Sequence, residues 1–271
     1  MRLKRLLLIT SMVMSAIILF AGCTGEDVQP VGIYNRTLEA VEAANSFEFV
    51  LETEHTFREL STEEAIEPSN IITTTGSVTL KPLALACEAE TLQRIHVDDS
   101  GWDVRQSWYI VDDLLYYSQH FMEPDWIVMD SDRLFLHMGR SNTDPMNYFN
   151  LLGEEGAAKA SLQKEGQHYV IRVDTPYDNL MERIERQLQY IFDISNSSYE
   201  ISTFEASFWI DHDSYILEKS SFTLEINILD LDGDIIFELK LADEYKNFGT
   251  IDKITIPDEV RDNAVDFEDY F

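Results

Sequence analysis

The sequence predicts an α+β fold in which one curved antiparallel sheet forms an incomplete β-barrel and a few helices cover its apolar face. Most of the chain after residue 46 alternates apolar and polar side chains with a period of two, which is typical of strands with one buried and one solvated face. Turn residues separate these strands at short intervals, so neighbours are expected to pair antiparallel. No repeat or long linker divides residues 33–271, which predicts a single half-barrel domain with an acidic C-terminal tail.

The composition excludes several other classes of protein. The chain carries 50 acidic and 20 basic side chains, a formal net charge of −30. It would therefore repel a nucleic acid, whose phosphates are bound mainly through Lys and Arg. Hydrophobic residues make up 45% of the chain and aromatic residues 11%, which is more than a disordered chain keeps. We expect an acidic globular domain with a sizeable core.

Residues 1–22 are predicted to be a lipoprotein signal peptide. Basic residues open this segment, an apolar run follows over 6–20, and Gly22 precedes Cys23. The run is short for a membrane span, and its end resembles the bacterial lipoprotein signal, in which the cysteine receives a lipid and becomes the N-terminus. We expect cleavage between Gly22 and Cys23, a lipid on Cys23, and a tether over residues 23–32 at the extracytoplasmic face of a cell membrane. The alternatives are an ordinary secretory signal and an uncleaved anchor.

The first half of the domain is predicted to be a helix followed by strands. The helix is expected over residues 33–44, where apolar side chains recur at helical spacing. From Phe47 onward the period changes to two. We expect strands over 47–57, 71–81, 83–96, 104–111, 114–119 and 126–130. Asp-rich turns at 98–101 and 112–113 separate several of them.

The second half mixes helices with strands. A short helix is predicted from Asp144 to Leu152, where the following glycines end it. Thr175-Pro176 predicts the start of another helix, whose apolar stripe includes Leu188. We expect a hairpin over 163–174 and strands over 204–210, 222–228 and 235–241. Much of the acidic end, residues 258–271, is expected to be loosely held.

Aromatic strand motifs recur along the chain. They are Trp108-Tyr109, Leu115-Tyr116-Tyr117, and the segments 126–130, 208–211, 217–219, 245–248 and 254–259. With the order of elements, they resemble the lipoprotein-carrier superfamily of bacterial envelopes over residues 33–260, and segment 254–259 resembles its closing strand. That superfamily includes the Lol carriers and the lipid-binding lipoproteins of mycobacteria. The resemblance implies a hydrophobic cavity between sheet and helices. The soluble Lol carrier is unlipidated, so Cys23 favours a fixed ligand binder over a shuttle.

The candidate ligand-binding residues are apolar side chains on predicted strand faces and on the helix after Pro176. They are Phe47, Phe49, Leu51, Trp108, Tyr116, Phe208, Phe222 and Leu188. The alternative is that they fill a solid core, since packed interiors leave no room for a ligand. The residues alone do not separate these interpretations. The resemblance favours a cavity, with the helix that contains Leu188 as a candidate lid.

The sequence contains no recognised catalytic or metal-binding motif. Its histidines and cysteines lack the spacing of a zinc site, and neither a Gly-x-Ser-x-Gly elbow nor a phosphate-binding loop occurs. With a lipid on Cys23, Cys87 has no disulfide partner, and its apolar neighbours predict a buried side chain. Residues 230–234 are acidic but lack the spacing of an EF-hand, so we predict a hairpin turn and leave weak calcium binding open.

The sequence patterns, together with what the resemblance implies about a cavity, predict a membrane-anchored lipoprotein that binds a hydrophobic ligand, a lipid or a lipid-linked molecule, without catalysis, cofactor or metal. The alternative is a surface interaction or sensor module with a packed core, which binds a protein or another component of the cell envelope. A cavity beneath the sheet would favour the first hypothesis, and a dry interior would favour the second.

Overall fold

A computed structural model describes residues 28–59, 70–93, 102–120, 124–131, 145–182, 198–229 and 234–270. The strands are β1 (Ser46–Glu59), β2 (Asn70–Leu80), β3 (Leu83–Gln93), β4 (Trp102–Val111), β5 (Leu114–Gln119), β6 (Trp126–Asp130), β7 (Ser161–Glu165), β8 (His168–Val173), β9 (Ser198–Asp211), β10 (Leu217–Leu229), β11 (Ile235–Lys246) and β12 (Ala264–Asp266). The helices are α2 (Pro30–Ala44), α4 (Asn147–Lys159), α6 (Asp258–Asn263) and α7 (Phe267–Tyr270).

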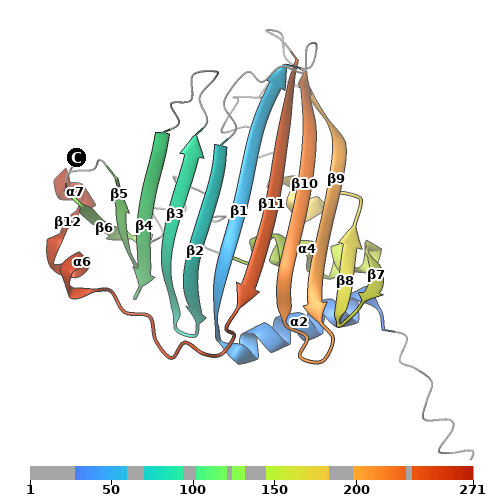
Figure 1. The fold of residues 1–271 in the computed structure, drawn as a ribbon, viewed down its shortest axis with the longest axis horizontal. Helices are drawn as coiled ribbons and strands as arrows, with labels where there is room; N and C mark the ends of the chain where they lie inside the picture. The colour runs from blue at the N-terminus through green and yellow to red at the C-terminus, as the bar shows by residue number, and fades with distance from the viewer. Residues whose placement is uncertain are drawn as a thin grey trace, which may run out of the picture.

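All these strands belong to one twelve-stranded sheet with two open edges (Figure 1). Its order is β12-β6-β5-β4-β3-β2-β1-β11-β10-β9-β8-β7. Neighbouring strands pair antiparallel, except that β12 pairs parallel with β6. The predicted class, an α+β fold with a curved antiparallel sheet that forms an incomplete barrel, is confirmed.

The β4–β5 turn shows how turn chemistry sets the register of this sheet. Asp112 and Asp113 adopt φ angles of 53° and 64°, in the left-handed region that Asp tolerates better than most residues. This two-residue turn pairs Val111 with Leu114 and thereby fixes every pair further along the two strands. β5 and β6 have the bounds that the alternation predicts.

Helix α2 confirms the first predicted helix and begins three residues earlier, at Pro30. Proline suits this first position because the amide it lacks would have no helical acceptor there. The helix buries Ile33, Tyr34 and Val41 on one side. It ends at Asn45, whose φ of 61° turns the chain while its N–H donates to the Val41 carbonyl at 3.1 Å.

Helix α4 corrects the prediction of a helix that ends at Leu152. Gly153 does interrupt the helical backbone, with φ 60° and ψ 177°, but helical turns resume and continue to Lys159. They resume where the chain packs closely: a Cβ added to Gly156 would lie 2.7 Å from the Leu152 side chain. Gly156 therefore serves close packing, whereas the sequence pattern suggested a helix end. The next predicted helix is described only over residues 178–182.

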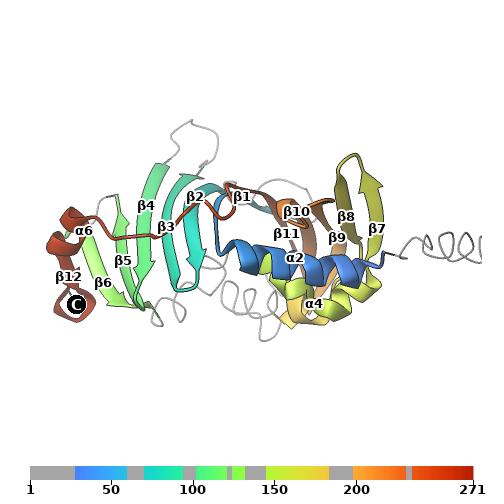
Figure 2. The same cartoon turned by 90° about the horizontal axis from the view of Figure 1, so that it is seen from below.

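The C-terminal segment corrects two predictions, a closing strand at 254–259 and a loosely held end. Residues 251–257 form neither strand nor helix, and Pro257 has no amide hydrogen for a strand ladder. The segment crosses one end of the sheet (Figure 2), with Ile254 and Val260 buried. α6 and the short parallel strand β12 then extend the β6 edge. Burial of these side chains and the pairing of β12 hold the acidic end in place.

The two faces of the sheet differ in what covers them. We call the face against which α2 and α4 pack the inner face, and the opposite one the outer face. Ring centroids place α4 on the inner face: Phe149 lies 5.2 Å from Phe208 of β9, and Tyr148 lies 5.0 Å from Phe222 of β10. Figure 2 shows α2 and α4 on this side of β9–β11, whereas no described helix covers the same side of β2–β4.

Candidate functional site

One row of paired residues traces the inner face across the sheet. It runs from β11 to β5 through Tyr245, Phe49, Gly76, Cys87, Trp108 and Tyr117. The adjacent row, on the outer face, runs through Lys246, Glu48, Ser77, Ala86, Tyr109 and Tyr116. Directly opposite residues in a ladder point to the same side of a sheet, so the register assigns each side chain to a face.

The inner face is almost free of charge, although the chain is strongly acidic. From Phe47 to Phe57 of β1, and at the positions paired with them across β2–β5 and β9–β11, its described residues include a single carboxylate, Asp243. His55 also lies on this face, and burial lowers its pKa, which favours the neutral ring. Apart from Asp243 and the exposed Glu59 at the end of β1, the charged side chains of these strands occupy the outer positions, where water solvates them. The inner face is therefore suited to apolar and neutral groups.

Asp243 is held by a small hydrogen-bond network near α4. Its carboxylate accepts a hydrogen bond from the Ser220 hydroxyl at 2.7 Å and lies 3.4 Å from the Tyr245 hydroxyl. Tyr245 donates to the Pro145 carbonyl at 2.9 Å, so it connects the sheet to the chain just before α4. Burial raises the pKa of Asp243 to about 6, and the hydrogen bonds from Ser220 and Tyr245 offset part of that rise.

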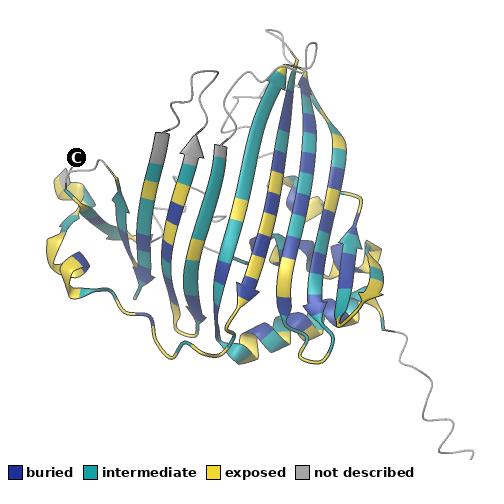
Figure 3. Ribbon diagram, viewed as in Figure 1, coloured by how far each residue is buried: buried dark blue, intermediate teal, exposed yellow. Residues whose placement is uncertain are grey.

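Two regions of the inner face differ in burial (Figure 3), and a third set on β1–β5, which includes Leu85, Trp108 and Leu115, is also buried. The covered region is buried throughout and consists of Phe204, Ala206, Phe208, Ile210, Phe222, Leu224, Ile226, Ile228, Phe237, Leu239 and Leu241 on β9–β11. The open region is half-buried and consists of Leu51, Thr53, His55 and Phe57 on β1, Ile72 and Thr74 on β2, Thr91 on β3, Val104 and Gln106 on β4, and Tyr117 and Gln119 on β5. Both regions belong to one continuous sheet face, but only the open one leaves apolar surface within reach of a ligand.

The structure brings most of the predicted ligand-binding residues to the inner face. Phe47, Phe49, Leu51, Trp108, Phe208 and Phe222 all lie there. Of these, Phe208 and Phe222 pack under α4, while Leu51 lies in the open region. Leu188, the candidate lid residue, lies outside the described residues, as do Gly22 and Cys23.

Tyr116 was assigned to the wrong face. The Asp112-Asp113 turn pairs Trp108 with Tyr117, so Tyr117 shares the inner face with Trp108 and Tyr116 points to the outer face. Counting the alternation through this turn would have placed Tyr117 beside Trp108. Because Tyr116 and Tyr117 are adjacent and identical, the residue type alone did not show which one lies on the inner face. The prediction also missed Ile72 and the polar residues of the open region, because threonine and glutamine do not read as parts of an apolar site.

Gly76 lies where the Phe49 ring and the Cys87 sulfur approach the backbone of β2. A Cβ added there would be 2.5 Å from the Ala86 carbonyl oxygen, 2.7 Å from the Phe49 ring and 2.9 Å from the Cys87 sulfur. Glycine is therefore needed at this position for the sheet to pack. Cys87 is buried, as predicted, and burial raises the pKa of its thiol, which keeps it protonated.

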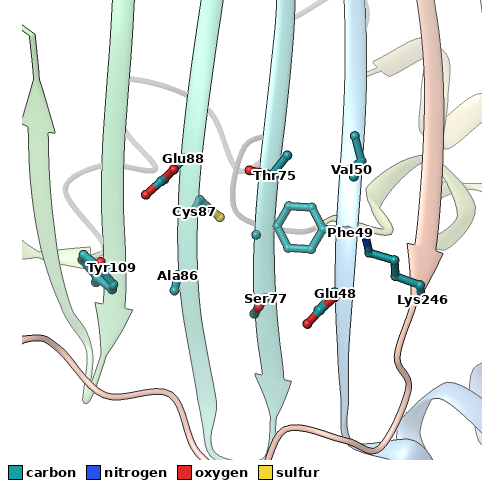
Figure 4. Close-up of a pocket in the computed structure, with 11 residues that line it drawn as sticks. Glu48, Phe49, Val50, Thr75, Ser77, Ala86, Cys87, Glu88, Tyr109 and Lys246 are labelled. Carbon is teal, nitrogen blue, oxygen red and sulfur yellow. The ribbon is translucent and has the colours of Figure 1, made fainter.

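A shallow hollow of about 330 Å³ lies over Gly76. Outer-face side chains form most of its lining, including Glu48, Tyr109 and Lys246, with Phe49 and Cys87 beneath them (Figure 4). Its walls mix charged, polar and apolar groups and open to solvent. A lipid chain would gain less there than on the uncharged inner face.

The family model described as "Family of unknown function (DUF6612)" matches residues 30–265, which span the fold from α2 to β12. The chain belongs to this family. A search of curated proteins finds no match to this DUF6612 chain.

Several solved structures resemble this DUF6612 chain at low identity. LprF from Mycobacterium bovis is 12% identical with a TM-score of 0.36, over 83% of this chain and 96% of that one. A DUF1329 family protein from Desulfovibrio piger is 8% identical with a TM-score of 0.29, over 80% and 94%. The ywiB protein of Bacillus subtilis is 7% identical with a TM-score of 0.22, over 75% and 94%. At these scores, none of the three supports a conclusion about this protein.

Within the described part of this DUF6612 chain, no three His, Cys, Asp or Glu side chains gather closely enough to hold a metal ion. No helix among the same residues combines the length and apolar character of a membrane span.

Proposed function

We propose that this DUF6612 protein binds a hydrophobic ligand, a lipid or a lipid-linked molecule, against the open region of its inner face and releases it unchanged. The observation that carries the proposal is the scarcity of charge on the described inner face of a chain with a net charge of −30, where Asp243 is the one carboxylate between Phe47 and Phe57 and the positions paired with them, together with half-buried apolar side chains in the open region. Each methylene that a ligand buries there contributes about 0.8 kcal/mol.

Binding without turnover fits the placement of the titratable groups. His55 pairs directly with Leu239, whereas Asp243 lies four residues further along β11. That separation is about 13 Å along a strand, too far for an acid and a base to act on one bond. Asp243 pairs directly with Leu51 at the edge of the open region, but it is buried and hydrogen-bonded to Ser220. These distances support a binding role.

Membrane anchoring is part of the same proposal. A lipid on Cys23 and a signal peptide cleaved after Gly22 would hold the domain at the extracytoplasmic face of a cell membrane. Pro30 follows Cys23 by seven residues, so α2 would begin within about 25 Å of the lipidated residue. Replacing Cys23 with Ala should abolish incorporation of labelled palmitate into the protein, because no thiol remains at position 23 to carry the lipid. Incorporation equal to that of the wild type would contradict lipidation at this residue.

The binding proposal is tested by native mass spectrometry of the chain after Gly22 with Cys23→Ser, which removes the lipid and keeps every described residue. The protein is incubated with a bacterial lipid extract, repurified and weighed. We expect discrete adducts of lipid mass. Ile72 and Ile71 provide a matched pair, since both are half-buried isoleucines on β2 but only Ile72 lies on the inner face. Ile72→Asp should remove the adducts, and Ile71→Asp should keep them.

A clean unliganded mass across lipid classes would contradict the proposal. It would favour the alternative, a packed module that binds a protein or another envelope component through its surface. Loss of the adducts in Ile71→Asp but not in Ile72→Asp, with both variants folded by circular dichroism, would place the ligand away from the inner face.

A further inference from the structure

Four side chains form a polar group within the otherwise apolar inner face of β4 and β5. They are Gln106, Trp108, Tyr117 and Gln119, and we call them the β4–β5 cluster. Trp108 is paired directly with Tyr117, and Gln106 with Gln119. Side chains at such positions have Cβ atoms about 5 Å apart, so the four lie within one small patch. Three of them, Gln106, Tyr117 and Gln119, are members of the open region.

The Tyr117 hydroxyl organises the two amides of this cluster. It accepts a hydrogen bond from Gln106 Nε2 at 3.0 Å and donates one to Gln119 Oε1 at 2.8 Å. In this arrangement the hydroxyl uses its one proton on Gln119 and accepts from Gln106, so one amide donates to it and the other accepts. The remaining half of each amide stays available. The cluster thus offers one amide oxygen and one amide nitrogen to a ligand.

Trp108 adds a donor that has no acceptor among the described residues. The residue is 7% exposed, and its indole nitrogen is buried without a hydrogen-bond partner in that part of the chain. Buried tryptophans usually pair this N–H, because a donor removed from water without a partner is costly. An acceptor atom from a bound ligand would remove that cost. The unpaired donor therefore points to a ligand, independently of the apolar surface around it.

The charge around the cluster limits which ligands fit. Arg105, the cation in the same strand, points to the outer face and pairs there with Glu90 at 3.1 Å. No lysine or arginine of the described open region offers a counter-charge on the inner face. A phosphate or carboxylate would lose its hydration without an ionic partner. A neutral carbonyl or hydroxyl would lose less and could use the indole and amide donors.

We propose that the β4–β5 cluster recognises the uncharged polar part of the ligand, an ester or amide carbonyl next to a hydroxyl, while the ligand's hydrocarbon lies on the rest of the open region. This rests on the proposed function and names its ligand class, a neutral acylated molecule. The Trp108 indole N–H donates to the ligand carbonyl, and the free amide groups pair with the adjacent hydroxyl.

The test compares two probes on the chain after Gly22 with Cys23→Ser. Diphenylhexatriene is a fluorescent hydrocarbon, and 1-monooleoylglycerol carries an ester and two hydroxyls. Fluorescence titration gives the affinity for the first, and its displacement gives the affinity for the second. In Trp108→Phe and in Tyr117→Phe, the monooleoylglycerol affinity should fall about fivefold, the loss of one neutral hydrogen bond, while the diphenylhexatriene affinity stays within about twofold.

Two outer-face variants are matched controls for these substitutions. Trp209→Phe and Tyr116→Phe make the same chemical changes on the opposite face and should leave both affinities unchanged. Oleate, which has a charged head on the same chain, should bind the wild type more weakly than monooleoylglycerol. A second readout is the indole ¹⁵N–H resonance that disappears in Trp108→Phe. It should move downfield with monooleoylglycerol and not with diphenylhexatriene.

The outcomes separate this inference from the function on which it rests. If the wild type binds diphenylhexatriene and monooleoylglycerol but the cluster variants bind both as well as the wild type does, the cluster is not a recognition site and the binding function stands. Equal weakening of both probes in Trp108→Phe would also overturn the inference, because it would show a packing role alone. If the wild type binds neither probe, both the inference and the proposed function fail.

Discussion

The covered and open regions have similar chemistry but different surroundings. Both present side chains without formal charge on one continuous face, and both come from strands that alternate with a period of two. In the covered region α4 places Phe149 against Phe208, and the face is buried. In the open region the same kind of strand face is half-buried. The comparison teaches that alternation specifies which side of a strand avoids charge, whereas helix packing decides whether that side becomes core or binding surface.

The difference in packing between the two regions is tested most directly by truncating one large side chain in each region and comparing the loss of stability. Phe208 is 1% exposed, so Phe208→Ala should lower the free energy of unfolding by about 3–5 kcal/mol through a buried cavity. Leu51 is half-buried, so Leu51→Ala removes less buried apolar surface and should lower the free energy of unfolding by about 1 kcal/mol. Urea denaturation measures both. Equal costs would mean that the open region is as tightly packed as the core.

Asp243 lies at the margin of the covered region. Its buried carboxyl group should give the free energy of unfolding an unusual pH dependence. Its pKa is about 6 in the fold and 3.8 without it, so the folded state binds more protons between these values. Stability from this group is therefore present below pH 4 and is lost as the pH rises towards 6. The full loss would be roughly 3 kcal/mol, from about two pKa units.

Asp243→Asn should remove that dependence, so its stability relative to the wild type should rise between pH 4 and pH 7. Urea denaturation at several pH values measures the difference. Glu244→Gln, the next residue on the outer face, is the matched control and should follow the wild type. Parallel curves for wild type and Asp243→Asn would show that the carboxyl group titrates normally.

A substitution at Gly76 tests how tightly β2 is packed between β1 and β3. Gly76→Ala should destabilise the fold by about 2 kcal/mol, because the new methyl group meets the Ala86 carbonyl and displaces Phe49. Gly32→Ala in α2, where a Cβ meets no atom within 4 Å, should instead stabilise the protein by about 0.5–1 kcal/mol. Thermal melting of the two variants checks the opposite signs. A neutral Gly76→Ala would mean that β2 can shift at low cost.

The smallest effect is expected on the outer face, directly behind the open region. Arg105 and Glu90 form an exposed ion pair at 3.1 Å. Arg105→Gln should change the free energy of unfolding by less than about 0.5 kcal/mol, and added salt should reduce even that difference. A loss above 1 kcal/mol in urea denaturation would show that outer-face charges contribute to holding the sheet together.

Much of this fold could be predicted from local pattern. Alternation placed most strands near their observed bounds, and the Asp112-Asp113 pair marked a hairpin whose geometry follows from two residues. The errors in helix and strand bounds occurred where packing of the folded chain decides the outcome; a Cβ added to Gly156, for example, would also lie 3.4 Å from the Tyr177 ring. Gly153 suggested a helix end, yet α4 continues beyond it, and Pro257 lies in a connection that the sequence suggested was a strand. Such choices depend on partners that a local pattern does not contain.

The candidate site shows the same division at the level of single residues. The sequence by itself determined that charge alternates with apolar side chains along the strands, because each strand must bury one face and solvate the other. Only the tertiary structure decided that α4 packs on Phe208 and Phe222, and that the Trp108 indole lacks an acceptor among the described residues. Register and helix docking bring together residues far apart in the chain, and the free energy of those contacts is not encoded in any one segment.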